Sequence, residues 1–111
     1  MSEVPEEISV AETSRLLSDG KILLLDCRES DEHATTRIEG AKLVPLSTWS
    51  SAFPDAFPTQ KDAAIVIHCH HGMRSLRATR FLRQQGYTAV QSMAGGIEAW
   101  SLEVDPSVPR Y

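Results

Sequence analysis

Two short apolar runs constrain the fold of this chain more than any other feature of its sequence. Residues 21–27, KILLLDC, and residues 63–69, AAIVIHC, are apolar almost throughout and carry no helical stripe. Runs of this kind are typical of strands buried on both faces of a parallel sheet. Amphipathic segments lie before the first run and after the second. The pattern therefore predicts an α/β fold in which a parallel sheet is covered by helices on both faces.

Caps and breakers place the other expected elements. Ser9 and Glu12 have the spacing of a capping box, which predicts a helix through about Leu17 that Gly20 ends. Residues 47–62 mix small, aromatic and proline residues and predict one helical turn followed by a loop. The remaining expected elements are a helix at 30–34, a weaker strand within 41–46, a helix at 74–85, a strand and turn within 87–96, a helix at 97–102 and an irregular tail at about 103–111.

Size and charge limit the classes of function. The 111 residues suit one domain, and 11 Lys and Arg against 15 Asp and Glu give a formal charge of −4. This balance argues against a general nucleic-acid binder and against a protein that binds anionic membranes. The acidic N-terminus does not resemble a signal peptide, and no apolar run approaches the roughly 18 residues of a membrane helix. We therefore expect a cytoplasmic monomer with no nucleic-acid or membrane partner.

Reactive and charged residues follow both apolar runs. Asp26 to Glu29 follow the first run, and His68 to His71 end the second. In open parallel sheets, ligands bind outside the carboxyl ends of the strands, so we expect both groups at one edge of the sheet. The two cysteines, Cys27 and Cys69, do not form a C-x-x-C pair, which indicates neither a disulfide framework nor a zinc knuckle.

The loop after Cys69 has the features of an anion cradle. A tight turn over residues 70–73 precedes the expected helix, and Gly72 permits a backbone angle that a side chain would forbid. The N–H groups of such a turn and of the helix start can point inward at the sulfur. With Arg74 near by, they are expected to lower the thiol pKa from about 8.5 towards roughly 3.5 to 7.5. The resulting thiolate could attack sulfur, phosphorus or arsenic centres that carry anionic oxygens.

Two other interpretations of this segment remain open at this point. Cys69 could be a small buried residue at a strand end, as cysteines often are. His68, His70, His71 and Cys69, joined by His33, are also ligand types for zinc or copper. However, adjacent histidines do not easily aim at one ion, and metal-ligand spacings are absent, so no metal is predicted. The histidines would then adjust the charge of the loop mouth, with His68 a hydrogen-bonded strand-end residue.

Four stretches resemble one family. The loop CHHGMRS, preceded by His68 and followed by an Arg-rich helix, resembles the active-site loop of rhodanese-type sulfurtransferases. LLDCRESDE resembles the family's Asp-x-Arg-Glu stretch, RIEGAKLVP its His-Ile-Pro-Gly-Ala…Pro stretch, and MAGGIEAW its closing Gly-Gly-x-x-x-Trp. They occur in the family's order. The loop is also similar to that of rhodanese domains fused to ubiquitin-activating-like adenylyltransferases.

The resemblance implies one rhodanese domain over residues 1–111, with a central, mainly parallel five-stranded sheet. It also implies that catalytic Cys69 accepts sulfane sulfur from thiosulfate or a persulfide donor and passes it to cyanide, a thiol or a sulfur-carrier protein. A cysteine desulfurase or thioredoxin is a further expected partner, and no metal or organic cofactor is implied. The implied substrate-binding residues are His70, His71, Gly72, Met73 and Arg74, and the implied supporting residues are Asp26, Arg28 and Ser75.

Other functions of the same fold remain alternatives. Phosphatases of the cell-division-cycle type and arsenate reductases have five residues between cysteine and arginine, whereas Cys69 and Arg74 enclose four. The smaller ring is expected to suit a sulfur atom better than a phosphoryl group. Inactive relatives that serve as interaction modules usually lack the cysteine. The sulfurtransferase interpretation requires Cys69 to be reached from solvent and the loop amides to face it.

Departures from the family pattern and several outlying residues complete the expectations. Thr36-Arg37 and Glu39 replace a common Gly-His and proline, which concerns loop shape more than chemistry. Cys27 occupies a position usually held by an aliphatic residue and is expected to be a buried core thiol, with a role as resolving cysteine as the alternative. Asp26 and Arg28 are expected to brace the sheet edge, through hydrogen bonds or a pair with Glu32. The remaining expectations are Met73 and Trp49 at the pocket mouth, Trp100 in the core, and Arg77, Arg80 and Arg83 on a solvated helix face.

Overall fold

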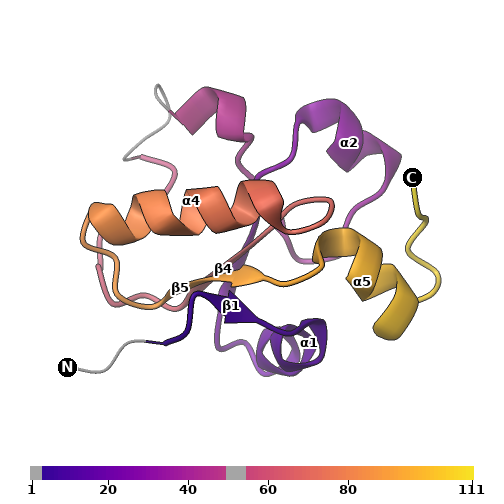
Figure 1. Cartoon of the computed structure of the whole chain (residues 1–111), viewed down its shortest axis with the longest axis horizontal. Coiled ribbons are helices and arrows are strands. Elements are labelled where there is room, and N and C mark those ends of the chain that lie inside the picture. Colours follow the sequence, from indigo (N-terminus) through magenta and orange to yellow (C-terminus); the bar gives the residue numbers. More distant parts are fainter. Residues whose placement is uncertain (1–3, 50–54) are drawn as a thin grey trace.

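A parallel five-stranded sheet forms the centre of the computed structural model, which describes residues 4–49 and 55–111 (Figure 1). The strand order is β1-β5-β4-β2-β3, and every pairing is parallel. The α/β fold class expected from the sequence is confirmed. The strands are β1 (Glu7–Ile8), β2 (Leu23–Asp26), β3 (Lys42–Leu43), β4 (Ile65–His68) and β5 (Val90–Met93).

Helices cover both faces of the sheet, as the sequence predicts. Figure 1 shows α4 on one side of the sheet and α1 on the other. One apolar cluster packs beneath α4 and the other packs against α1 and α5. The described helices are α1 (Val10–Ser18), α2 (Ser30–Thr35), the 3-10 turn η1 (Leu46–Thr48), α4 (Met73–Gln84) and α5 (Gly96–Glu103).

The central strands β2 and β4 alternate their side chains between the two clusters. Leu25 and Ile67 belong to the cluster beneath α4, and Leu24 and Val66 belong to the other. All four are at most 1% exposed. This alternation is the period-two geometry of a strand, and it explains why both faces of the runs are apolar. Trp100 is also buried in the core, as expected.

Element boundaries differ from expectation in a few places. The Ser9 side chain caps α1 by accepting from Glu12 N at 3.1 Å, but the Glu12 carboxylate pairs with Arg15. Strand β3 has only two residues, and α4 begins at Met73, one residue earlier than expected. Within 47–62, η1 supplies the expected turn, while 50–54 lie outside the described residues. Each helix in the described ranges is too short or too polar to span a bilayer.

Candidate active site

The two groups of reactive residues meet at one edge of the sheet, as the sequence predicts. Strands β2 and β4 run in parallel, with Asp26 opposite His68. The chain then continues from these positions into Cys27 on one side and Cys69 on the other. The N–H of Cys27 donates to the His68 carbonyl at 3.0 Å, so the two strand ends stay paired beyond their last assigned residues.

Cys69 Sγ receives hydrogen bonds from the turn and from the start of α4. Gly72 N lies 3.1 Å from the sulfur and Ser75 N lies 3.3 Å from it. Gly72 precedes the helix with φ of 108°, a left-handed conformation that suits glycine. Ser75 N is one of the first-turn amides that have no partner within a helix, and an N-cap side chain ordinarily accepts from such an amide. The Cys69 sulfur takes that place, where the helix dipole favours an anion.

A chain of buried hydroxyls supports the sulfur from the side. Ser75 Oγ lies 3.4 Å from Cys69 Sγ and 2.7 Å from Ser92 Oγ on β5. When Ser92 donates to Ser75, the Ser75 proton can go either to the Gly72 carbonyl oxygen, 3.3 Å away, or to the sulfur. The sequence indicated Ser75 as a supporting residue, but it did not indicate Ser92. Ser92 is a polar residue with no local motif, and only the pairing of β4 with β5 brings it to this place.

The surroundings hold Cys69 as a thiolate at neutral pH. The Cys27 thiol, the Ser75 hydroxyl and the backbone N–H groups of Ser75 and Gly72 together lower the pKa of Cys69 to about 4, against an opposing effect of burial. The largest of these causes is the neighbouring Cys27 thiol, which is fully buried as expected of a core thiol. The inward-facing amides required by the sequence interpretation are therefore present, although they come from Gly72 and Ser75 rather than from residues 70–74 as a whole.

Solvent access to Cys69 differs from the expectation. Cys69 is only 1% exposed. By contrast, Met73, the first residue of α4, is 71% exposed. The requirement that the sulfur be open to solvent is not met in this conformation. A donor can reach Sγ only after the loop shifts.

The first turn of α5 holds the loop in position. Ile97 N donates to the Cys69 carbonyl at 2.9 Å, and Glu98 N donates to the His70 carbonyl at 3.2 Å. A Cβ added at Gly96 would lie 2.3 Å from the His70 carbonyl oxygen, and Gly96 has φ of 63°. Only glycine allows helix and loop to approach this closely. Gly96 of the MAGGIEAW stretch thus helps to position the loop of the candidate site, a role that the sequence resemblance did not indicate.

Arg74 does not point at the sulfur. Its Nη1 and Nη2 lie 2.8 and 2.9 Å from the two carboxylate oxygens of Glu32 on α2, a bidentate pair. This pair is the main cause that lowers the pKa of Glu32 to about 2. Of the two ways in which the sequence predicts that Arg28 braces the sheet edge, hydrogen bonds are present and a carboxylate pair with Glu32 is not: the Glu32 carboxylate pairs with Arg74, and Arg28 Nη1 donates to the Glu32 carbonyl oxygen at 3.4 Å. Substrate binding by Arg74 therefore requires it to exchange this carboxylate for the donor.

Asp26 and Arg28 form a buried ion pair that braces the edge of the sheet. Arg28 Nε lies 2.9 Å from Asp26 Oδ1, and Arg28 Nη2 lies 2.8 Å from Oδ2; both side chains are 0% exposed. Arg28 Nη2 also donates to the Thr36 carbonyl at 2.6 Å. His33 Nδ1 lies 3.0 Å from Asp26 Oδ2. Burial works to raise the pKa of Asp26, but Arg28 and the nearby histidines lower it overall. These contacts agree with the structural role expected for both residues.

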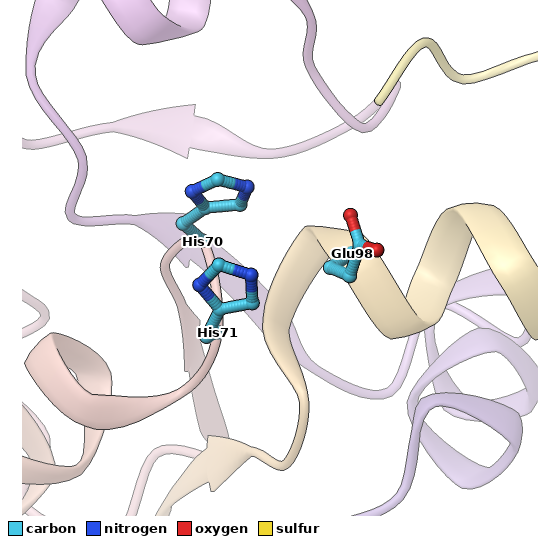
Figure 2. A group of neighbouring side chains, drawn as sticks. All are labelled: His70, His71 and Glu98. Atoms are coloured by element: carbon cyan, nitrogen blue, oxygen red, sulfur yellow. The ribbon is translucent and has the colours of Figure 1, made fainter. Parts of the chain in front are cut away.

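The histidines of the loop lie beside a carboxylate (Figure 2). Possible ligand atoms of His70, His71 and Glu98 all lie within 4.8 Å of one another. The two imidazoles are stacked, with their ring centroids 3.9 Å apart and their planes at 24° to each other. Tetrahedral zinc would need ligand atoms roughly 3.4 Å apart. Glu98 also accepts from Arg110 Nε at 3.0 Å. A metal would have to rotate the rings and displace Arg110, and the absence of a metal stays a prediction.

An apolar pocket of about 430 Å³ lies beside α4. Trp49 lines it, together with Leu46, Arg77, Ala78 and Phe81. Met73 does not belong to this lining, so the structure separates the two residues expected to share one pocket mouth.

The outer cations of α4 are mostly paired rather than free. Arg80 Nε lies 3.1 Å from Glu6 Oε2, and Arg83 donates to backbone carbonyls, including that of Val90. These contacts anchor the helix to strand β5 and to the segment before β1.

Comparison with known proteins agrees with this geometry. A family model described as Rhodanese-like domain matches residues 9–103. Thiosulfate sulfurtransferase GlpE of Pseudoalteromonas translucida (strain TAC 125) is 33% identical over 107 residues, which cover 95% of this chain and 97% of that protein. The solved structure of the human single-domain sulfurtransferase TSTD1 superposes with a TM-score of 0.82 and 31% identity, and it covers 90% of this chain and 98% of that chain.

Larger relatives share the same segment. The adenylyltransferase and sulfurtransferase MOCS3-1 of Zea mays is 34% identical over 109 residues, which cover 94% of this chain and 23% of that protein. The chain spans 38% or less of the length of the first curated relatives that it matches, the maize protein among them. By its matched residues, its fold and the relatives that share its full length, the chain belongs to the rhodanese-like domain family.

Proposed function

We propose that this chain is a sulfurtransferase in which the Cys69 thiolate carries sulfur as a persulfide. The single observation that carries this proposal is the pair of backbone donors at Sγ, Gly72 N at 3.1 Å and Ser75 N at 3.3 Å, with the Ser75 hydroxyl 3.4 Å away. These donors stabilise a negative charge at this position, as preorganised dipoles do in active sites. The name of the GlpE relative supports thiosulfate as the donor.

The first half-reaction loads the cysteine. Cys69 Sγ attacks the outer sulfur of thiosulfate and forms a new S–S bond. The bond between that sulfur and the sulfonate sulfur breaks, and sulfite leaves with the electron pair. The outer sulfur of the resulting persulfide is an anion that the loop amides can hold. No metal or organic cofactor takes part in these steps.

The second half-reaction unloads it. A nucleophile such as cyanide or a thiol attacks the outer sulfur, and Cys69 leaves as a thiolate. A thiol of lower pKa leaves faster in such exchanges, so the pKa of about 4 favours release of Cys69, and it also keeps the attacking group ionised at neutral pH. One set of hydrogen bonds thus serves both halves of the reaction.

Access to the sulfur makes the loop a moving part of this mechanism. Cys69 is 1% exposed, so donor and acceptor must enter while the loop over residues 70–74 is displaced. The loop is tied down at two places, by α5 amides on the Cys69 and His70 carbonyls and by the Arg74–Glu32 pair. Of these ties, the ion pair is partly exposed and is the one that an anionic donor can compete for.

The physiological reactants stay predictions. We expect a small-molecule sulfur donor and acceptor, with a cysteine desulfurase, thioredoxin or a sulfur-carrier protein as further candidates. A cytoplasmic location, a monomeric state and one domain over residues 1–111 are likewise expectations from the sequence.

The test is thiocyanate formation from thiosulfate and cyanide by the full chain. We expect turnover by the wild-type protein and none by Cys69→Ser. Thr79→Val is the matched control, because Thr79 Oγ1 is buried on α4 and makes no hydrogen bond within the described part of the chain. The proposal fails if Cys69→Ser keeps its turnover. Hydrolysis of an aryl phosphate without thiocyanate would favour a phosphatase, and neither activity would favour an interaction module.

A further inference from the structure

Cys27 is a buried thiol that the proposed function does not use, and it lies beside Cys69. Strands β2 and β4 pair in parallel up to Asp26 and His68, and Cys27 and Cys69 occupy the next position on each chain. The bond from Cys27 N to the His68 carbonyl, 3.0 Å long, continues the ladder to that position. Paired strands lie about 4.8 Å apart. That spacing is within the Cα separation of roughly 4.4–6.8 Å that a disulfide spans.

Both sulfurs face the same side of the sheet. Leu25 and Cys27 belong to the apolar cluster beneath α4, as do Ile67 and Cys69. The two cysteines are 0% and 1% exposed, and both are free thiols in this structure. Cys27 is therefore shielded from solvent reagents, while the Cys69 sulfur lies within its reach.

We propose that Cys27 is an internal nucleophile that attacks the inner sulfur of a Cys69 persulfide, releasing hydrogen sulfide and leaving a Cys27–Cys69 disulfide. This inference rests on the proposed function, because thiosulfate supplies the persulfide. The new bond joins Cys27 Sγ to Cys69 Sγ, and the bond from Cys69 Sγ to the outer sulfur breaks. The outer sulfur leaves with the electron pair and takes the Cys27 proton. Cys27 is oxidised and the outer sulfur is reduced, so persulfide and thiol become disulfide and H2S without another oxidant.

The negative charge on Cys69 suppresses the nucleophilicity of Cys27 in the resting protein. The neighbouring Cys69 thiolate and burial together raise the pKa of Cys27 far above its usual range. Cys27 then stays protonated and is a poor nucleophile. Once Cys69 carries a second sulfur, Sγ is no longer a thiolate and the negative charge moves to the outer atom. The suppression of Cys27 weakens at that stage of the cycle alone.

The consequence is a second outcome for each loaded sulfur. With an external acceptor present, the outer sulfur is transferred and Cys69 is regenerated directly. Without an external acceptor, Cys27 attacks the persulfide and the Cys27–Cys69 disulfide forms. The disulfide persists until a small thiol reductant restores both cysteines through thiol–disulfide exchange. The chain would then release sulfide from thiosulfate at the expense of thiols.

The test loads the full-length wild-type protein with thiosulfate, removes the excess and follows it without acceptor. Released sulfide is measured with a sulfide-reactive dye, and the protein is measured by non-reducing mass spectrometry. We expect about one equivalent of sulfide per chain, from the balance of the exchange, and a cross-linked peptide joining Cys27 and Cys69. The rate should not depend on protein concentration. Cys27→Ser keeps a hydroxyl beside Cys69, whereas Cys27→Val removes the group that helps to lower the Cys69 pKa. Both variants are checked for folding by circular dichroism and are loaded at a pH at which intact mass shows one added sulfur, which each should then keep over the same period.

The possible outcomes distinguish failure of this inference from failure of the proposed sulfurtransferase function. Sulfide release by both Cys27 variants at the wild-type rate overturns the inference and leaves the sulfurtransferase intact. A wild-type persulfide that persists without a cross-linked peptide does the same. If no protein gains a sulfur in the loading step, the proposed function fails and this inference falls with it.

Discussion

Removal of the Ser75 hydroxyl should raise the pKa of Cys69 without unfolding the protein. Ser75 Oγ lies 3.4 Å from Sγ, while the backbone N–H of the same residue donates independently and is kept in Ser75→Ala. A hydrogen bond to a charged group contributes about 1.5–3 kcal/mol, and one pKa unit corresponds to about 1.4 kcal/mol. The pKa of Cys69 should therefore rise by about one to two pH units from its value of about 4. Ser92 loses its partner, which costs about 1–3 kcal/mol of folding stability.

The assay is the ultraviolet absorbance of the thiolate, titrated with acid over the range in which circular dichroism shows each protein folded. Cys27 does not interfere, because its pKa is raised and it stays protonated throughout. Thr79→Val removes another buried hydroxyl from α4 and should leave the midpoint unchanged. Equal midpoints for wild type and Ser75→Ala, or an equal shift in the control, would refute the role assigned to this hydroxyl.

Three further predictions concern stability and donor binding. Gly96→Ala should lower the free energy of unfolding, measured in urea, by about 2–4 kcal/mol, because backbone strain and a clash with His70 combine. Gly20→Ala is the control: Gly20 has φ of 69° and nothing within 4 Å of an added Cβ, so this change should cost about 1 kcal/mol. Equal losses in the two variants would contradict the packing argument. Glu32→Gln frees Arg74 and should lower KM for thiosulfate several-fold in steady-state kinetics, and an unchanged KM would show that Arg74 does not meet the donor. Relative to Cys69→Ala, the wild-type free energy of unfolding should rise with pH between about 4 and 9, because there the unfolded thiol binds a proton that the native thiolate lacks; parallel pH profiles would contradict a lowered native pKa.

Local patterns in the sequence predicted the framework of the site. The runs around Leu25 and Ile67 could be identified as strands because both faces of each strand are buried. Gly72 could be identified because a tight turn between a strand and a helix needs a residue that accepts a positive φ. Cys69 could be identified because it lies at the end of the strand, where the N–H groups of that turn and of the helix start face inward. These features depend on neighbours within a few positions of the chain.

Contacts between distant segments could not be predicted in this way. The Ser75–Ser92 hydrogen bond depends on the pairing of β4 with β5, and the Arg74–Glu32 pair depends on where α2 packs. The burial of Cys69 depends on how α5 holds the loop carbonyls. Cys27 attracted notice as a departure from the family pattern, but only the register of β2 against β4 places it beside Cys69.

Peptide mapping of the thiosulfate-treated protein tests most directly whether Cys69 carries the sulfur. Wild-type protein is mixed with thiosulfate, trapped at once with an alkylating reagent in acid, and digested without reductant. One additional sulfur should appear on the peptide that contains Cys69, disappear after cyanide, and be absent from Cys69→Ser. An added sulfur found on Cys27, or no added sulfur in a folded wild-type protein, would contradict the assignment of Cys69 as the sulfur carrier.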